Sequence, residues 1–113
     1  MSQVQSLEKS TRVNASMLPL FKGKMVRLTG KVVQVDKENG VFIVEASDGG
    51  QVAVLDNKNV TVKDPIVEVI GKVIEDNCIS MATCVNMGCD LDLKLVNDVV
   101  NLIHDPRFFG KIF

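Results

Sequence analysis

Five short apolar-rich runs, separated by turn sequences, constrain the fold of this chain more than any other feature, and in the first of them Val26 and Leu28 alternate with Arg27 and Thr29. Successive side chains of a β-strand point to opposite faces, so a two-residue period indicates a strand with one buried face. Tight-turn sequences join the runs: Asn-Gly at 39–40, Gly-Gly at 49–50 and Asp-Asn at 76–77. The Asn-Gly step supplies the positive φ that short hairpins require. The predicted strands cover residues 25–35, 41–46, 51–55, 66–75 and 78–87.

The order of these strands predicts a barrel. A polar connection, residues 56–64, separates the first three strands from the last two. The five-stranded Greek-key OB barrel has this topology: three strands joined by hairpins, then a long connection, then two more strands. Gly30 and Gly71 interrupt the first and fourth strands, where barrel closure calls for a bulge or a bend. The predicted fold class is therefore an all-β OB barrel, although the strand count alone also allows an SH3-like barrel or a small sandwich.

We expect a short helical segment before the barrel and a longer helix after it. Asn14 is a good N-cap for a short turn carrying Met17, Leu18 and Phe21, whose apolar side chains would plug one end of the core. The predicted parts are a loose N-terminus (1–10), the barrel (11–90), a C-terminal oligomerisation helix (91–105) and a tail (106–113).

The C-terminal helix is amphipathic over a wide arc. Asp92 is its predicted N-cap and Pro106 its stop. With residues placed at about 100° intervals, apolar side chains cover about 180° of the helix, whereas about 100° is enough to dock a surface helix on its own core. The surplus predicts one or two helices from other chains, unless a large barrel face covers the whole arc. The predicted interface residues are Leu93, Leu95, Val96, Val99, Val100, Leu102 and Ile103.

Composition and charge weigh against a strong autonomous nucleic-acid binder. The chain has no Trp, no Tyr and a net charge of -1, whereas single-strand binders combine a basic groove with stacked aromatic rings. Residues 1–40 do carry seven basic and three acidic side chains. Possible DNA contacts are Lys24, Arg27, Lys31 and Phe42. Phe42 is at least as well explained as a core residue, so any direct binding should be weak.

The sequence also carries no pattern typical of an enzyme, a metal site or a membrane protein. Cys78, Cys84 and Cys89 lack the spacing of a zinc site, and we interpret them as small core or half-buried residues. His104, the single histidine, has no nucleophile motif beside it and is expected to be solvated near the helix C-terminus. No apolar run reaches the ~20 residues of a membrane span, and the polar N-terminus predicts no secretory signal. We expect no catalytic residue, cofactor, metal or small-molecule substrate.

Three segments resemble one known family. They are Arg-Val-Asn-Ala at 12–15 followed by Met17-Leu18 and Phe21, then 67–73 (VEVIGKV), and Leu-Ile-His-Asp at 102–105 followed by Phe108 and Phe109. In this order they resemble the small subunit of replication protein A, over about residues 11–110.

The resemblance implies one OB barrel whose C-terminal helix bundles with helices from the middle and large subunits. The complex implied is the nuclear heterotrimer that coats single-stranded DNA in replication, repair and recombination, with slight DNA contact by this subunit. Two alternatives stay open. One is an autonomous nucleic-acid-binding module that uses Arg27, Lys31 and Phe42, and the other is the small OB subunit of a telomere-capping trimer.

Overall fold

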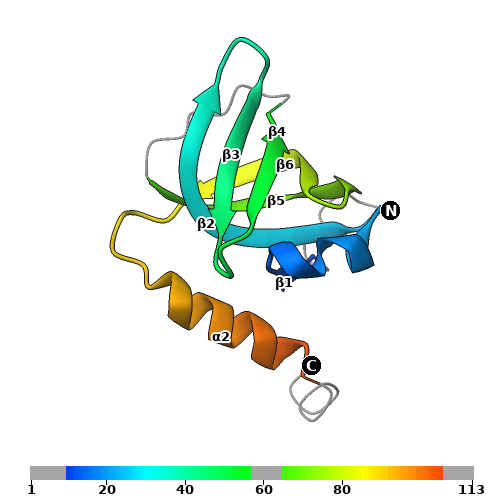
Figure 1. The fold of residues 1–113 in the computed structure, drawn as a ribbon, viewed down its shortest axis with the longest axis vertical. Helices are drawn as coiled ribbons and strands as arrows, with labels where there is room; N and C mark the ends of the chain where they lie inside the picture. The colour runs from blue at the N-terminus through cyan, green and yellow to red at the C-terminus, as the bar shows by residue number, and fades with distance from the viewer. Residues whose placement is uncertain (1–9, 57–64, 106–113) are drawn as a thin grey trace.

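A closed β-sheet forms the centre of the molecule (Figure 1). The computed structural model describes residues 10–56 and 65–105. Residues 1–9 of the predicted loose N-terminus, residues 57–64 of the polar connection and the tail 106–113 with Pro106 lie outside the described residues. The elements are β1 (Thr11–Val13), the 3-10 helix η1 (Ala15–Phe21), β2 (Met25–Asp36), β3 (Val41–Ala46), β4 (Gln51–Leu55), β5 (Ile66–Glu75), β6 (Cys78–Asn86) and α2 (Leu93–Ile103).

The strand order is that of an OB barrel. The strands are hydrogen-bonded in the order β1-β2-β3-β4-β6-β5, and β5 pairs back with β2 to close the barrel. β4 and β6 pair in parallel. They are neighbours in the sheet although β5 lies between them along the chain. The five predicted strands match β2 to β6 within one residue at every end, and the predicted fold class is confirmed.

β2 serves two sides of the barrel. Its first half, from Met25 to Lys31, pairs with β5, and its second half, from Gly30 to Asp36, pairs with β3. Figure 1 shows this long strand curving around the barrel. A Cβ at Gly30 would overlap the Glu45 carbonyl and the Val44 side chain, so the glycine permits close approach of β3. The register between β2 and β3 shifts between Val32 and Gln34, beyond Gly30, whereas the register between β5 and β6 shifts between Ile70 and Gly71, where a bulge or bend was predicted.

The inward-facing residues of the barrel strands form an aliphatic core. Leu18 of η1 is fully buried against it, so the predicted plug is confirmed. The buried strand residues alternate with exposed or half-buried ones along β3 and β4, as a two-residue period requires. Phe42 is one of the buried residues. Its ring therefore lies inside the barrel and is unavailable for stacking on a base, which corrects its assignment as a possible DNA contact.

The N-terminus of η1 is capped differently from the prediction. Asn14 occupies the N-cap position but makes no side-chain capping hydrogen bond. Instead, the backbone N–H groups of Ala15 and Ser16 donate to the carboxylate of Asp48, at 3.2 and 3.0 Å. β1, which precedes η1, pairs in parallel with β2 and was not predicted, because three residues are too few to show a period.

α2 lies beside the barrel, close to β1 and β2 (Figure 1). The Asp92 carboxylate accepts hydrogen bonds from the backbone N–H groups of Lys94 and Leu95, at 3.0 and 3.3 Å. The predicted N-cap is therefore confirmed, and the helix lies within two residues of its predicted ends at both termini. Within the described residues, no helix is long and apolar enough to cross a membrane.

Candidate subunit interface

α2 docks on the barrel through one edge of its apolar arc and the polar residues next to that edge. Val100 is only 2% exposed. One turn away, the Asn97 Oδ1 accepts hydrogen bonds from Asn14 Nδ2 at 2.9 Å and from Ser47 Oγ at 3.3 Å. Asn14 Nδ2 also lies 3.4 Å from Asn101 Oδ1. The helix therefore contacts the barrel through a mixed surface, not through the middle of its apolar face.

His104 belongs to the same contact. Its Nε2 lies 2.8 Å from the Arg12 carbonyl oxygen, and because a carbonyl only accepts, Nε2 is the donor. The imidazole ring also meets the Phe21 ring edge-on, with centroids 5.6 Å apart. The expectation of a solvated histidine is therefore wrong, because α2 turns the polar edge of its arc toward the barrel.

This rotation of α2 leaves the other edge of the arc open. Leu95 is 61% exposed, and Val99 and Leu102 are each 44% exposed. We call these three residues the outer stripe. Of the other predicted interface residues, Leu93, Val96 and Ile103 are half-buried, and Val100 belongs to the contact between helix and barrel. An aliphatic stripe of this kind on a docked helix is typical of a surface that another protein covers.

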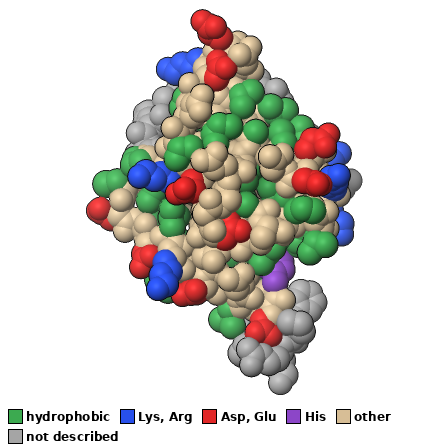
Figure 2. All heavy atoms as spheres, in the orientation of Figure 1, with side chains coloured by type: hydrophobic (Ala, Val, Ile, Leu, Met, Phe, Trp, Pro, Cys, Tyr) green, Lys and Arg blue, Asp and Glu red, His purple; other side chains and the backbone are tan. Residues whose placement is uncertain are grey.

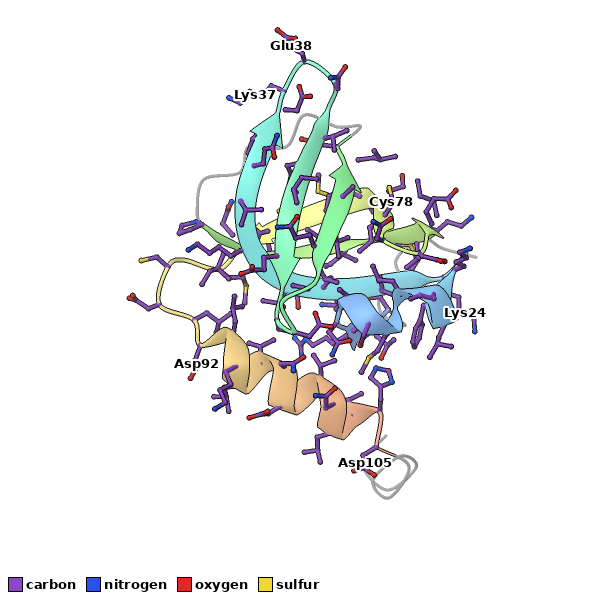
Figure 3. The ribbon with its side chains drawn as sticks, viewed as in Figure 1. Lys24, Lys37, Glu38, Cys78, Asp92 and Asp105 are labelled. Atoms are coloured by element: carbon purple, nitrogen blue, oxygen red, sulfur yellow. The ribbon has the colours of Figure 1, made fainter. Side chains whose placement is uncertain are left out.

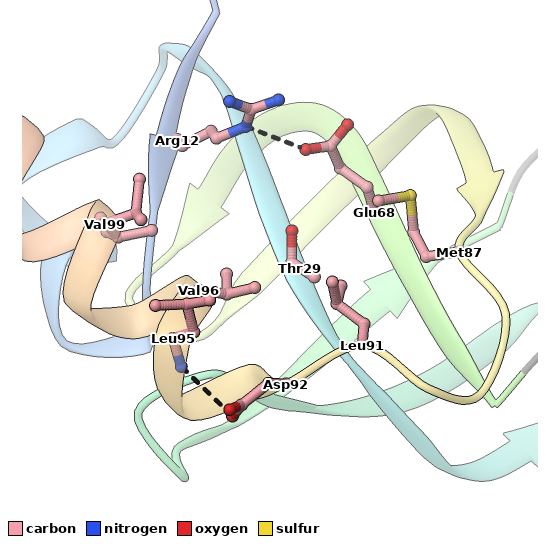
Figure 4. A pocket seen from close by; sticks show the side chains of 10 residues that line it. Arg12, Thr29, Glu68, Met87, Leu91, Asp92, Leu95, Val96 and Val99 are labelled. Atoms are coloured by element: carbon pink, nitrogen blue, oxygen red, sulfur yellow. Dashed lines mark hydrogen bonds and ion pairs between the residues drawn. The ribbon is translucent and has the colours of Figure 1, made fainter.

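An apolar groove of about 220 Å³ continues the outer stripe toward the barrel (Figure 4). Leu95 and Val99 belong to both the stripe and the groove. The barrel side of the groove includes Thr29 of β2 and Glu68 of β5, which are register partners in the sheet. The remaining lining residues are Arg12, Met87, Leu91, Asp92, Val96 and Val100. Stripe and groove together give a partner one continuous aliphatic surface beside a barrel wall.

Glu68 is a buried carboxylate with two basic neighbours. Its Oε2 lies 3.3 Å from Arg12 Nε, and its Oε1 lies 3.8 Å from Arg27 Nη1. A buried charge is tolerated when it is paired and hydrogen-bonded. Arg27 also donates from Nε to Ser10 Oγ at 2.8 Å. Arg27 is therefore half-buried and engaged inside the chain, which argues against its predicted role as a DNA contact.

The outer face of β2, β3 and β4 is the surface on which OB barrels commonly bind single strands. Here the register places Lys31 opposite Glu45 and Ile43 opposite Ala53. The only aromatic residue of these strands, Phe42, faces the core. This face therefore offers aliphatic side chains and balanced charge, without the stacking rings that single-strand binding uses.

The two lysines predicted as DNA contacts are exposed but separated. Lys24 precedes β2 and Lys31 lies in its middle, seven residues further along, which is about 23 Å of extended strand at about 3.3 Å per residue. Figure 3 places Lys24 at the end of the barrel away from the hairpin tip that carries Lys37 and Glu38. Acidic and basic side chains are intermingled on the face drawn in Figure 2. The structure does not bring the four predicted DNA contacts into one site.

The three cysteines are free thiols that differ in exposure. Cys78 and Cys84 are half-buried, as predicted, whereas Cys89 is exposed, which corrects its assignment. Loss of hydration on burial raises the pKa of the Cys78 thiol and raises that of Cys84 to about 11, so both are protonated near neutral pH. In residues 10–56 and 65–105, no His, Cys, Asp and Glu side chains cluster as a metal site would require.

An OB barrel with a helical plug before it and a stripe-bearing helix after it defines a class, the small OB-fold subunits. The chain belongs to the Replication factor A protein 3 family, whose family model matches residues 1–109. It is 31% identical over 99 residues to "Replication factor A protein 3" of Schizosaccharomyces pombe, covering 87% of this chain and 92% of that protein.

Solved structures agree with the fold. A chain in the structure of U. maydis replication protein A bound to ssDNA matches with a TM-score of 0.76 and 30% identity, covering 82% of this chain and 87% of that one. A chain in the S. pombe Stn1-Ten1 complex matches with a TM-score of 0.67 and 15% identity, covering 83% and 90%. The second match, at this identity, shows the shared fold alone.

Proposed function

We propose that this chain is the assembly subunit of a replication protein A heterotrimer in the nucleus. Its α2 packs the outer stripe against helices of the middle and large subunits, and the complex coats single-stranded DNA in replication, repair and recombination. The observation that carries the proposal is the outer stripe itself: three large aliphatic side chains remain exposed on a helix that is already docked.

The spacing of the outer stripe supports a helical partner. Leu95, Val99 and Leu102 are four and three residues apart, so they form one ridge along the helix. Helix-in-groove recognition uses this i, i+4, i+7 pattern of anchors. The groove beside the ridge, closed by the barrel wall at Thr29, offers a second surface to the same partner.

Direct DNA contact by this chain is a minor part of the proposal. Phe42 is buried and Arg27 is paired with Glu68, so neither supports the alternative of an autonomous binding module. The alternative of a telomere-capping subunit rests on a likeness of fold at 15% identity, and no feature of the site favours it.

Disruption of the outer stripe tests the proposal. The Val99→Asp/Leu102→Asp variant is co-expressed with the middle and large subunits and analysed by size-exclusion chromatography. Because two carboxylates would be buried in an aliphatic contact, this chain should elute apart from its partners. The control, Leu20→Asp/Val33→Asp, changes two side chains that are 79% and 47% exposed on η1 and β2 and should leave the trimer intact. A trimer that survives the stripe variant would overturn the proposal.

A further inference from the structure

Asn14 is a buried polar residue that bonds across 83 residues of sequence to α2. Its side chain is 2% exposed and lies between β1 and η1. The Nδ2 donates to Asn97 Oδ1 at 2.9 Å and to Asn101 Oδ1 at 3.4 Å, while the Oδ1 accepts from Ser16 Oγ at 2.8 Å. Both hydrogens of the amide group are therefore used on the helix.

The apolar contacts of α2 alone do not fix its rotation about its own axis. The apolar arc is about 180° wide, and apolar burial has no preferred direction. The helix could bury the outer stripe (Leu95, Val99 and Leu102) as readily as the edge that carries Val100. Hydrogen bonds do depend on direction. Rotation that buries the outer stripe would leave the Asn14 amide buried without its partners, which is strongly disfavoured.

We infer that Asn14 is a positioning residue that selects the rotation of α2 in which the outer stripe faces outward. The consequence for partner binding rests on the proposed function. A buried asparagine sets register in coiled coils by the same physical means, since it rejects arrangements that leave its amide unpaired.

A second contact extends this positioning along the helix. His104 donates to the Arg12 carbonyl, and His104 follows Asn97 by seven residues, about 10 Å along the axis. The segment from Arg12 to Phe21 therefore holds α2 at two points, two turns apart. The two points fix the direction of the helix as well as its rotation.

Hydrogen exchange on the full-length chain tests the contact itself. Asn14→Leu keeps the size of the side chain but removes its donors. Exchange of the α2 amides from Val96 to His104 should become at least about tenfold faster, while exchange in β2 to β6 changes by less than about twofold. The control Ser16→Ala removes only the bond to Asn14 Oδ1 and should leave α2 protected. Unchanged exchange in α2 with Asn14→Leu would overturn the inference.

A double-variant cycle separates positioning from general loss of packing. If Asn14 acts through Asn97, then Asn14→Leu combined with Asn97→Ala should accelerate α2 exchange by clearly less than the product of the two single accelerations. Some additional effect is expected, because Asn97 also bonds Ser47 and Asn14 also bonds Asn101. If the acceleration in the double variant instead equals the product of the two single accelerations, the two residues act independently, and the inference would be contradicted.

Partner capture tests the consequence. The Asn14→Leu chain should bind the co-expressed middle and large subunits about tenfold more weakly, although its outer stripe is intact. Faster exchange in α2 with full partner binding would overturn the positioning role. The stripe variant Val99→Asp/Leu102→Asp separates this outcome from failure of the proposed function. If the proposed function were wrong, the stripe variant would retain its partners.

Discussion

The Glu68 carboxylate and the Arg12 guanidinium lie 3.3 Å apart at the edge of the apolar groove, and Glu68 is only 6% exposed. Arg12 lies on β1 and Glu68 on β5, so this ion pair ties the N-terminal segment that holds α2 to the barrel wall. The same N-terminal strand supplies the carbonyl that His104 contacts. Groove, helix and N-terminal segment therefore form one connected unit.

Glu68→Ala should destabilise the chain by about 1–2 kcal/mol. Removal of one partner of a buried ion pair is strongly unfavourable, but Arg12 is half exposed and can regain water, which reduces the effect. Urea denaturation followed by circular dichroism measures the change. Lys22 and Asp76 form an exposed pair at 3.0 Å, so Asp76→Ala should have no measurable effect. Equal losses in both variants would contradict this description of Glu68.

Two glycines lie so close to neighbouring backbone that their replacement by alanine should destabilise the chain more than the same change at an open glycine. A Cβ at Gly71 would overlap the Ser80 carbonyl, as one at Gly30 would overlap that of Glu45. Gly71→Ala and Gly30→Ala should each destabilise the chain by about 1–3 kcal/mol. Gly23 has a positive φ and open space around it, so Gly23→Ala should be milder, about 1 kcal/mol. Thermal unfolding ranks the three variants, and a larger loss at Gly23 would refute this order.

Thiol reactivity should distinguish Cys89 from Cys84. Cys89 is exposed and Cys84 half-buried, with a pKa raised to about 11 by loss of hydration. Iodoacetamide at about pH 8 should therefore label Cys89 first, because the thiolate is the reactive form. Peptide mapping by mass spectrometry identifies the labelled residue. Rapid labelling of Cys84 in the folded chain would contradict the prediction.

The same pKa shift gives a pH dependence of stability. The Cys84 pKa is raised from 9.0 to about 11 in the folded chain, so the folded state holds its proton at a pH where the unfolded state has lost it. Stability therefore falls as the pH rises from 9 through about 11. Cys84→Ala should flatten this part of the pH profile in denaturation experiments. If stability falls equally steeply with pH in the Cys84→Ala variant, groups other than Cys84 cause the pH dependence.

The isolated chain should bind single-stranded DNA weakly. The predicted contacts do not converge, and the described barrel strands carry no outward aromatic ring. Fluorescence anisotropy with oligo-dT at about 150 mM salt should give a Kd weaker than micromolar. Lys31→Ala should change it little, since one phosphate contact contributes little at that salt concentration. Binding tighter than micromolar would instead favour the autonomous module.

The fold was largely predictable because short apolar runs are separated by tight-turn sequences. Residues 41–46 lie between the Asn-Gly and Gly-Gly turns and form β3 with the predicted bounds. β1 was missed because its pairing with β2 is a tertiary choice, which three residues cannot show. The bulge at Val33 was missed because a bulge residue need not be glycine.

The candidate interface was predictable in part. The width of the apolar arc indicated surplus aliphatic surface, and the structure leaves Leu95, Val99 and Leu102 exposed. Which edge docks on the barrel could not be read from hydrophobicity, because polar contacts decide it. Asn97 and His104 looked like solvated residues in the sequence, and their partners, Asn14 and Arg12, lie more than 80 residues away.

Site-specific photo-crosslinking can show whether helices of the partner subunits cover the outer stripe. A photoreactive amino acid is placed at Leu95 or Val99 of the outer stripe, and at Leu20 of η1 as an exposed control. The trimer is then irradiated and the cross-linked peptides are sequenced. If partner helices cover the outer stripe, cross-links form from positions 95 and 99 to helices of the middle or large subunit, and none from position 20. Cross-links to the partners from position 20 alone would contradict it.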